Sequence, residues 1–153
     1  MGSHNLTVPF IFYILWYTIS MQCLFCDIIN NKKVTLKVWE NDHFLIILDI
    51  RPINPGHLLL IPKVHFEDIY EIPEPLFSEL FQIAKKVATS LRKAVSAVRI
   101  GLAVEGFGMP HVHVHLVPVN NGNELNPERA KRASEIELQE MHSKLAVFFK
   151  DLT

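Results

Sequence analysis

The feature that most constrains this chain is a run of three histidines alternating with apolar residues between Pro110 and Pro118 (HVHVHLV). A β-strand points successive side chains to opposite faces, so His111, His113 and His115 are predicted to share one face. At about 3.3 Å of rise per residue, alternate imidazoles stand about 6.6 Å apart, close enough to serve one ligand or one metal ion. A solvated strand face could also carry histidines, but three in strict alternation favour a site.

Length and charge limit what surrounds that site. The chain has 153 residues, of which 49% are hydrophobic, and a chain of this size forms one domain with a single core. Its 15 basic and 16 acidic residues are well mixed and give a net charge of −1. Such a balance lacks the basic field that holds nucleic acid, so we expect no nucleic-acid partner, whereas a locally held small anion fits.

Residues 1–20 differ from the rest. Residues 8–19 (VPFIFYILWYTI) form an apolar run of 12 residues, shorter than the roughly 20 that span a membrane as a helix. The run resembles the apolar part of a signal peptide but lacks preceding Lys or Arg and a clear cleavage site. We therefore expect an apolar leader or upstream extension before a cytoplasmic domain over residues 21–153. Membrane attachment is expected only if residues 8–19 act as an anchor.

The remaining patterns predict an α+β domain. Alternating or continuous apolar runs predict five strands at residues 37–40, 44–49, 57–62, 98–104 and 111–119. The run at 57–62 (HLLLIP) is apolar throughout, which predicts burial on both faces. Apolar residues at helical spacing predict helices over residues 76–94 and 127–150. Five strands, mostly antiparallel, with two helices give an α+β domain.

Cys23 and Cys26 form a second motif, with the two-residue gap typical of a metal or redox pair. Two cysteines supply half of the four ligands that a structural zinc ion prefers, so two histidines would complete the site. The spacing does not choose between the candidates, which are His43, His57, His65, His111, His113 and His115. If the cysteines were idle, the three alternating histidines could instead hold a catalytic zinc. His4 and His142 lie outside every motif and are expected to be solvated.

Several motifs together resemble the histidine triad (HIT) superfamily, in its Hint-like zinc-binding branch. The run from His111 to Val117 is similar to the family signature of three histidines spaced by apolar residues. Around it, CLFCDII from Cys23, FLIILDI from Phe44, PGH ending at His57 and IPKVH ending at His65 fall in the family's order. The resemblance covers about residues 22–120. It implies an α+β meander, usually a homodimer in which two five-stranded sheets join.

The resemblance also implies roles for individual residues. Structural zinc would be held by Cys23, Cys26, His65 and His111. His113 would be the nucleophile, with His115 and His57 holding the phosphate. Asp49 would bind the ribose hydroxyls, and Phe25, Ile28, Leu48 and Ile50 would form the apolar slot for the base.

The implied reaction is attack of neutral His113 on the α-phosphorus of a nucleoside 5′-phosphoramidate or a related AMP derivative, followed by hydrolysis of the nucleotidyl-histidine. For this, the other ring nitrogen of His113 must donate to a fixed acceptor. A protonated His115 would stabilise the phosphoryl oxygens. Hydrolysis of dinucleoside polyphosphates and zinc-stabilised nucleotide binding with little turnover are the alternatives.

One loop departs from the family pattern. Most members carry Gly-Gln-Ser or Gly-Gln-Thr before the triad, whereas this chain has Gly-Phe-Gly-Met-Pro from Gly106 to Pro110. The hydrogen bonds of the missing Gln and Ser side chains must be replaced by backbone N–H groups or lost. The leaving-group preference is therefore left open by the resemblance.

Overall fold

The computed structural model describes residues 23–150 and Leu152. The expected leader at residues 1–20 lies outside the described residues. Within the described part of the chain, no helix combines the length and apolar character needed to cross a membrane.

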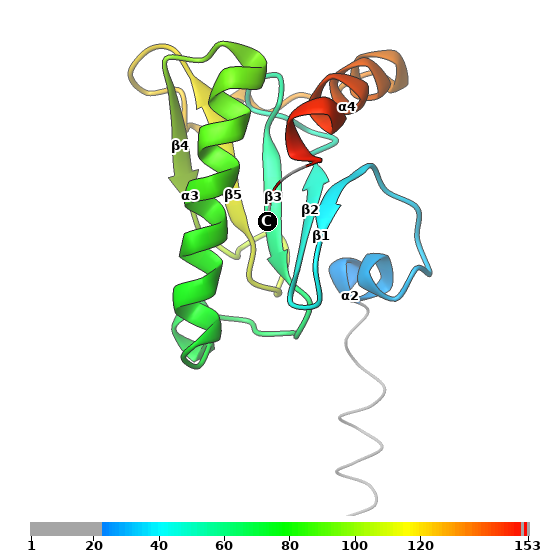
Figure 1. Ribbon diagram of the computed structural model, residues 1–153, viewed down its shortest axis with the longest axis vertical. Coiled ribbons are helices and arrows are strands. Elements are labelled where there is room, and N and C mark those ends of the chain that lie inside the picture. The colour runs from blue at the N-terminus through cyan, green and yellow to red at the C-terminus, as the bar shows by residue number, and fades with distance from the viewer. Residues whose placement is uncertain (1–22, 151, 153) are drawn as a thin grey trace, which may run out of the picture.

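The centre of the fold is a five-stranded sheet with the strand order β1-β2-β3-β5-β4 (Figure 1). Every neighbouring pair in it is antiparallel. The predicted α+β class and antiparallel sheet are confirmed. The strands are β1 (Lys37–Glu40), β2 (Phe44–Leu48), β3 (Leu58–Pro62), β4 (Arg99–Ala103) and β5 (Val114–Val119).

Over residues 23–150, three α-helices accompany the sheet: α2 (Leu24–Ile29), α3 (Leu76–Val95) and α4 (Glu135–Phe149). The helix predicted over 76–94 is confirmed as α3. The six-residue α2 was not predicted. The helix predicted over 127–150 is correct only from residue 135, because Pro127–Arg129 form a separate 3-10 turn (η2) and the Ser134 side chain caps α4. A further 3-10 turn, η1, covers Ile69–Glu71.

The sheet is covered unequally on its two faces. One face packs against both α3 and α4, and Phe44, Ile46 and Leu48 of β2 belong to that main core. The intervening Leu45 and Ile47 point to the other face, where they join Phe25 and Ile28. Both β2 and β3 are buried along their whole lengths, as predicted for the run at 57–62. Of the described helices, the short α2 alone lies on the second face, which leaves room beside it for a site.

The triad histidines lie on this second face. Regular strand pairing begins only at Val114, so His111 and His113 precede β5 rather than lying within it. The alternation of faces nevertheless extends back through them, because Val112 and Val114 lie in the main core. His113 instead contacts the ring of Phe25.

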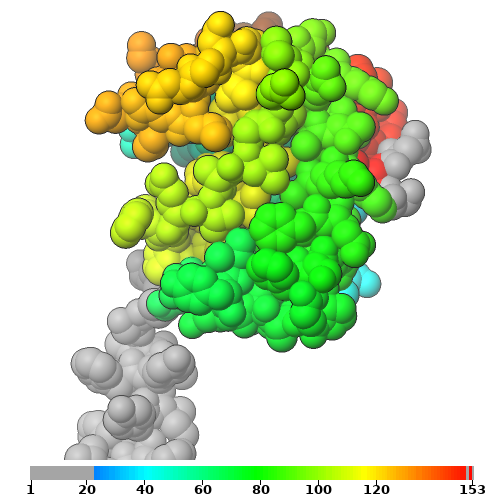
Figure 2. All heavy atoms as spheres, turned by 90° about the vertical axis from the view of Figure 1, so that its left-hand side faces the viewer, coloured from blue at the N-terminus to red at the C-terminus, as the bar shows by residue number. Residues whose placement is uncertain are grey.

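The strand β4 forms one edge of the sheet, beside α3 (Figure 1). Its side chains are exposed or half-buried, and Leu102 is 43% exposed. Figure 2 looks onto this side of the molecule, where the yellow-green segment between β4 and β5 stands out from the body. At the opposite edge, His142 of α4 donates from Nε2 to the carbonyl oxygen of Lys37 at 2.7 Å. The expectation that His142 is solvated is therefore wrong.

Candidate active site and metal centre

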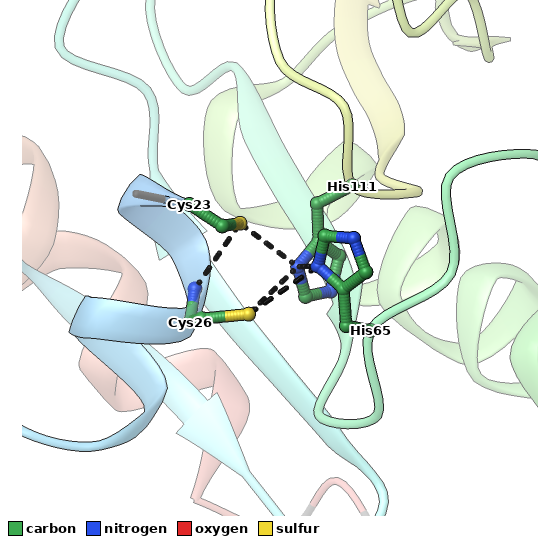
Figure 3. A group of neighbouring side chains, drawn as sticks. All are labelled: Cys23, Cys26, His65 and His111. Atoms are coloured by element: carbon green, nitrogen blue, oxygen red, sulfur yellow. Dashed lines mark hydrogen bonds between the residues drawn. The ribbon is translucent and has the colours of Figure 1, made fainter. Parts of the chain in front are cut away.

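Four metal-ligating side chains meet at the start of α2. Cys23 precedes this helix and Cys26 lies within it. His65 follows β3, and His111 opens the triad (Figure 3). Their donor atoms all lie within 4.8 Å of one another. The chain thus brings together the two cysteines and two of the six candidate histidines.

The spacing of these donors fits a tetrahedral zinc site. Zinc bonds of about 2.0 Å to nitrogen and 2.3 Å to sulfur imply ligands about 3.3 to 3.8 Å apart. In the structure, His111 Nδ1 lies 3.3 Å from Cys23 Sγ and 3.6 Å from Cys26 Sγ. His65 Nδ1 lies 3.3 Å from Cys26 Sγ and 3.2 Å from His111 Nδ1. The donor set and its spacing both suit zinc.

The protonation of these groups also suits a cation. His111 Nε2 donates to the carbonyl oxygen of Pro62 at 2.9 Å, which leaves Nδ1 with a lone pair that faces the thiols. Burial lowers the pKa of His111 to about 4, so the ring is neutral at pH 7. Burial and the adjacent Cys23 raise the pKa of the Cys26 thiol to about 11. A bound metal ion supplies the positive charge that turns such a thiol into a thiolate.

His113 is held in the tautomer that a nucleophile needs. Its Nδ1 donates to the carbonyl oxygen of His111 at 2.7 Å, so the lone pair resides on Nε2. The ring packs edge-on against Phe25 with centroids 5.1 Å apart, and His115 lies at 4.7 Å on another side. Contacts on both sides fix its direction.

A chain of hydrogen bonds orients His115. The backbone N–H of Ile53 donates to His57 Nδ1 at 3.2 Å, so the proton of neutral His57 is on Nε2. That nitrogen lies 2.9 Å from His115 Nδ1 and donates to it. The proton of His115 is therefore on Nε2, away from His57. Asp49 completes the group, with Oδ2 at 3.4 Å from His57 Nδ1.

Burial governs the charge of this pair. It lowers the pKa of His57 to about 4, against the opposing effect of the Asp49 carboxylate. Burial and the nearby His113 also lower the pKa of His115. At pH 7 His115 therefore acts as a neutral N–H donor, and the protonated form considered from the sequence is not the resting one.

The three triad rings do not gather on one metal ion. Among the described residues, His111 faces the cysteines and His115 is bonded to His57. The alternative of a three-histidine catalytic zinc with idle cysteines is therefore at odds with the geometry.

The apolar floor of the site differs in part from the prediction. Phe25 and Ile28 lie on the triad face of the sheet, buried with Ile47. Leu48 packs on the opposite face, beneath α3 and α4, so its assignment to the same slot is wrong. Side chains alternate along β2, and Ile47 occupies the position on the triad face. Ile50 follows β2 and is 47% exposed.

Two contacts within the candidate site could not be predicted from the sequence, because they involve backbone atoms. The N–H of Ile53 and the carbonyl of Pro62 set the tautomers of His57 and His111. No pattern of side-chain types signals such partners. Ile47, in contrast, could have been found, because the period of two that placed the histidines also separates it from Leu48.

The chain is similar to known proteins across most of its length. The HIT domain family matches residues 30–122. The adenylylsulfatase HINT3 of Arabidopsis thaliana is 29% identical, with 84% of this chain and 68% of that protein covered. The adenosine 5′-monophosphoramidase HNT1 of Saccharomyces cerevisiae is 30% identical over 66% of this chain and 65% of that protein.

A solved structure gives the same result for the fold. A zinc-bound histidine triad family protein from Mycobacterium smegmatis superposes with a TM-score of 0.73 at 29% identity, covering 86% of this chain and 96% of that one. The family match spans more than half of the sequence and includes His57, His65 and all three triad histidines. The chain therefore belongs to the HIT family of nucleotide-binding hydrolases.

Proposed function

We propose that this protein hydrolyses nucleoside 5′-phosphoramidates or related AMP derivatives at the α-phosphorus, through a nucleotidyl intermediate on His113. The observation that carries the proposal is the hydrogen bond from His113 Nδ1 to the carbonyl of His111, which presents an unprotonated Nε2. The relatives named an adenylylsulfatase and an adenosine monophosphoramidase act on AMP derivatives, which agrees with this substrate class.

The proposed reaction has two steps. His113 Nε2 attacks phosphorus, the bond to the leaving group breaks, and the leaving amine takes up a proton. Water then attacks the phosphorus and releases the mononucleotide and free His113. The N–H of His115, oriented by His57, donates to the phosphoryl oxygens where negative charge collects. Asp49 lies beside this pair, where it can accept from the ribose hydroxyls.

We propose that the metal is a structural zinc held by Cys23, Cys26, His65 and His111. When bound, zinc would fix the start of α2 to the segment that follows β3 and to the segment that leads into β5. Its four protein donors leave no open position for substrate, so its role is to support the site.

We further propose that a second copy of the chain covers the β4 edge. An edge strand leaves backbone N–H and C=O groups unpaired, and these groups favour pairing with another strand. The groove between α3 and β4, of about 910 Å³, is lined by apolar side chains such as Phe81, Ala88 and Leu102, together with the cationic side chains Lys85, Arg92, Lys93 and Arg99. The homodimer expected from the sequence would cover this surface.

The test of the reaction is intact-mass spectrometry of the zinc-loaded protein after brief mixing with adenosine 5′-phosphoramidate. The quench is neutral or alkaline, to preserve a phosphorus–nitrogen bond. We expect an adduct of one AMP per chain that is absent in His113→Ala. The exposed His43, which pairs with Glu79, provides the control: His43→Gln should form the adduct as the wild type does.

Three outcomes separate the candidate functions. An adduct that persists in His113→Ala would contradict the assignment of the nucleophile. Nucleotide binding without an adduct or AMP release would indicate the binding protein with little turnover. Faster release of AMP from a dinucleoside polyphosphate than from the phosphoramidate would favour the other hydrolase.

A further inference from the structure

The loop before the triad carries an aromatic side chain that the fold does not use. Phe107 is 97% exposed, although phenylalanine gains free energy on burial. Gly106 and Gly108 flank it, and a Cβ atom built on Gly108 would meet no atom within 4 Å. Gly106 has a φ of +87°, a conformation that favours glycine. The tip of the loop is thus held clear of the body.

The two ends of this loop are anchored beside the catalytic histidines. At one end, the Glu105 carboxylate acts electrostatically on His115. At the other end, Met109 packs against the buried cluster of Phe25 and Ile28. Phe107 lies midway between these anchors, so the loop holds it at the rim of the site.

The direction of attack places the leaving group on the loop side. In phosphoryl transfer the nucleophile and leaving group lie on opposite sides of phosphorus, roughly in line. His113 attacks from the sheet, because its ring is buried against Phe25 and bonded to the backbone through Nδ1. The leaving group therefore departs away from the sheet, towards the solvent side that the loop borders.

The loop offers that leaving group an apolar contact. From Gly106 to Pro110 the sequence GFGMP has no side chain that donates a hydrogen bond. We propose that Phe107 selects the leaving group by stacking on its aromatic or apolar body, which makes phosphoramidates of arylalkyl amines the preferred substrates. This inference rests on the proposed hydrolysis at His113.

The test compares two adenosine 5′-phosphoramidates, one of 3-phenylpropylamine and one of propylamine. The two amines are close in basicity, so the departing nitrogen is chemically matched and only the aromatic ring differs. Aromatic contacts are worth enough to change affinity about five- to tenfold. We expect the wild type to prefer the phenylpropyl substrate by about that factor in kcat/KM, and Phe107→Ala to lose the preference.

The kinetic parameter that changes in the variants shows whether stacking causes the preference for the phenylpropyl substrate. Stacking present in both the ground and transition states changes KM and leaves kcat unaltered. Phe107→Leu, which retains apolar surface without a ring, should fall between the other two proteins. Val147→Ala removes apolar surface from the exposed side of α4, on the other side of the sheet, and should behave as the wild type.

Dissociation constants measured in a His113→Ala background separate this proposal from the hydrolase itself. If the wild type turns over neither substrate, but the His113→Ala protein binds the phenylpropyl ligand about fivefold tighter than the propyl ligand and Phe107→Ala removes that difference, the hydrolysis proposal fails and the role of Phe107 stands. If Phe107→Ala weakens both ligands equally, the ring stacks on the nucleotide and the proposal is overturned. Equal affinity for the two ligands in the His113→Ala protein that retains Phe107, or no binding of either, also overturns it.

Discussion

The folded state disfavours the protonated form of His57. Burial lowers its pKa from 6.5 to about 4, because a charged imidazole would lose its hydration there. The unfolded chain binds a proton at this residue near pH 6.5, and the folded chain does so only near pH 4. Above pH 6.5 His57 is neutral in both states and does not reduce the free energy of unfolding. As the pH falls from 6.5 towards 4, the unfolded chain binds a proton that the folded chain does not, and the free energy of unfolding decreases.

The size of this effect can be measured. A difference of about 2.5 pH units corresponds to about 3 kcal/mol, lost progressively across that range. We expect His57→Gln to show a shallower fall in unfolding free energy than the wild type in urea titrations at pH 7, 6 and 5 with excess zinc. The metal ligands titrate in both proteins, so the difference isolates His57.

The exposed His43 serves as the matched control. His43→Gln removes an imidazole whose side chain is 58% exposed and which lies outside the buried histidine cluster, so it controls for the loss of a histidine as such. Parallel curves for the wild type and His57→Gln would show that burial of His57 does not govern acid stability.

At the scale of residues, the sequence predicts which side chains form the candidate site better than it predicts which groups contact them. The alternating histidines and the cysteine pair could be recognised as site residues because their residue types and spacing are themselves informative. The assignment of Leu48 to the slot failed, since it followed the resemblance and not the alternation along β2. The backbone partner of His57 could not be predicted, because any residue at position 53 except proline offers the same N–H.

At the scale of elements, the start of α4 depends on one side chain. Ser134 Oγ accepts from the N–H of Glu137, and the Glu137 carboxylate accepts from the N–H of Ser134. This reciprocal capping box satisfies two donors that the first turn of a helix leaves free.

Removal of the cap should weaken the fold by a measurable amount. We expect Ser134→Ala to lower the free energy of unfolding by about 1 kcal/mol in urea titrations. Ser143→Ala is the control, because Ser143 lies inside α4, is exposed and only bonds back to the carbonyl of Gln139. Its change should be within about 0.5 kcal/mol. An equal loss in both variants would argue against the cap.

The same capping box could have been used to predict the start of α4 from the sequence. Ser134 followed three residues later by Glu137 is a recognised helix start, and it would have corrected the beginning predicted at residue 127. The short α2 is different, because six residues show too little periodicity to stand out. Long elements such as α3 and the buried β3 could be predicted because their apolar patterns repeat.

At the scale of the whole molecule, metal content should set thermal stability. We expect one zinc ion per chain by elemental analysis, and its removal by a chelator to lower Tm. With free zinc at 100 times its Kd, mass action contributes about 2.7 kcal/mol, which corresponds to about 5–10 °C for a chain of this length.

Substitution of a ligand should reproduce the effect of the chelator. Cys26→Ser should lose zinc and become insensitive to chelation, whereas His43→Gln should retain one zinc ion. A Cys26→Ser protein that still binds one zinc per chain would contradict the four-residue site and revive a site built on the triad.

The exposed β4 edge leads to a prediction about assembly. We expect the wild type to be a dimer by light scattering and Leu102→Lys to be a monomer, because a charge replaces apolar surface at the proposed contact. Val34→Lys places the same charge on a fully exposed position and should remain a dimer. A monomeric wild type at micromolar concentration would contradict the proposed assembly.

Cys23 takes part in both the cap of α2 and the proposed metal site. This couples binding of the metal to binding of a ligand in the slot beside α2. It is the N-cap of α2, accepting from the N–H of Cys26 at 3.5 Å, and it is also one of the four metal donors. The same helix supplies Phe25 and Ile28 to the floor of the proposed nucleotide slot. A ligand that binds better when α2 is held in place must then raise the affinity for zinc, and zinc must raise the affinity for that ligand by the same factor. A cell poor in zinc and rich in nucleotide would thus hold a larger zinc-loaded fraction of this protein than its metal affinity alone gives.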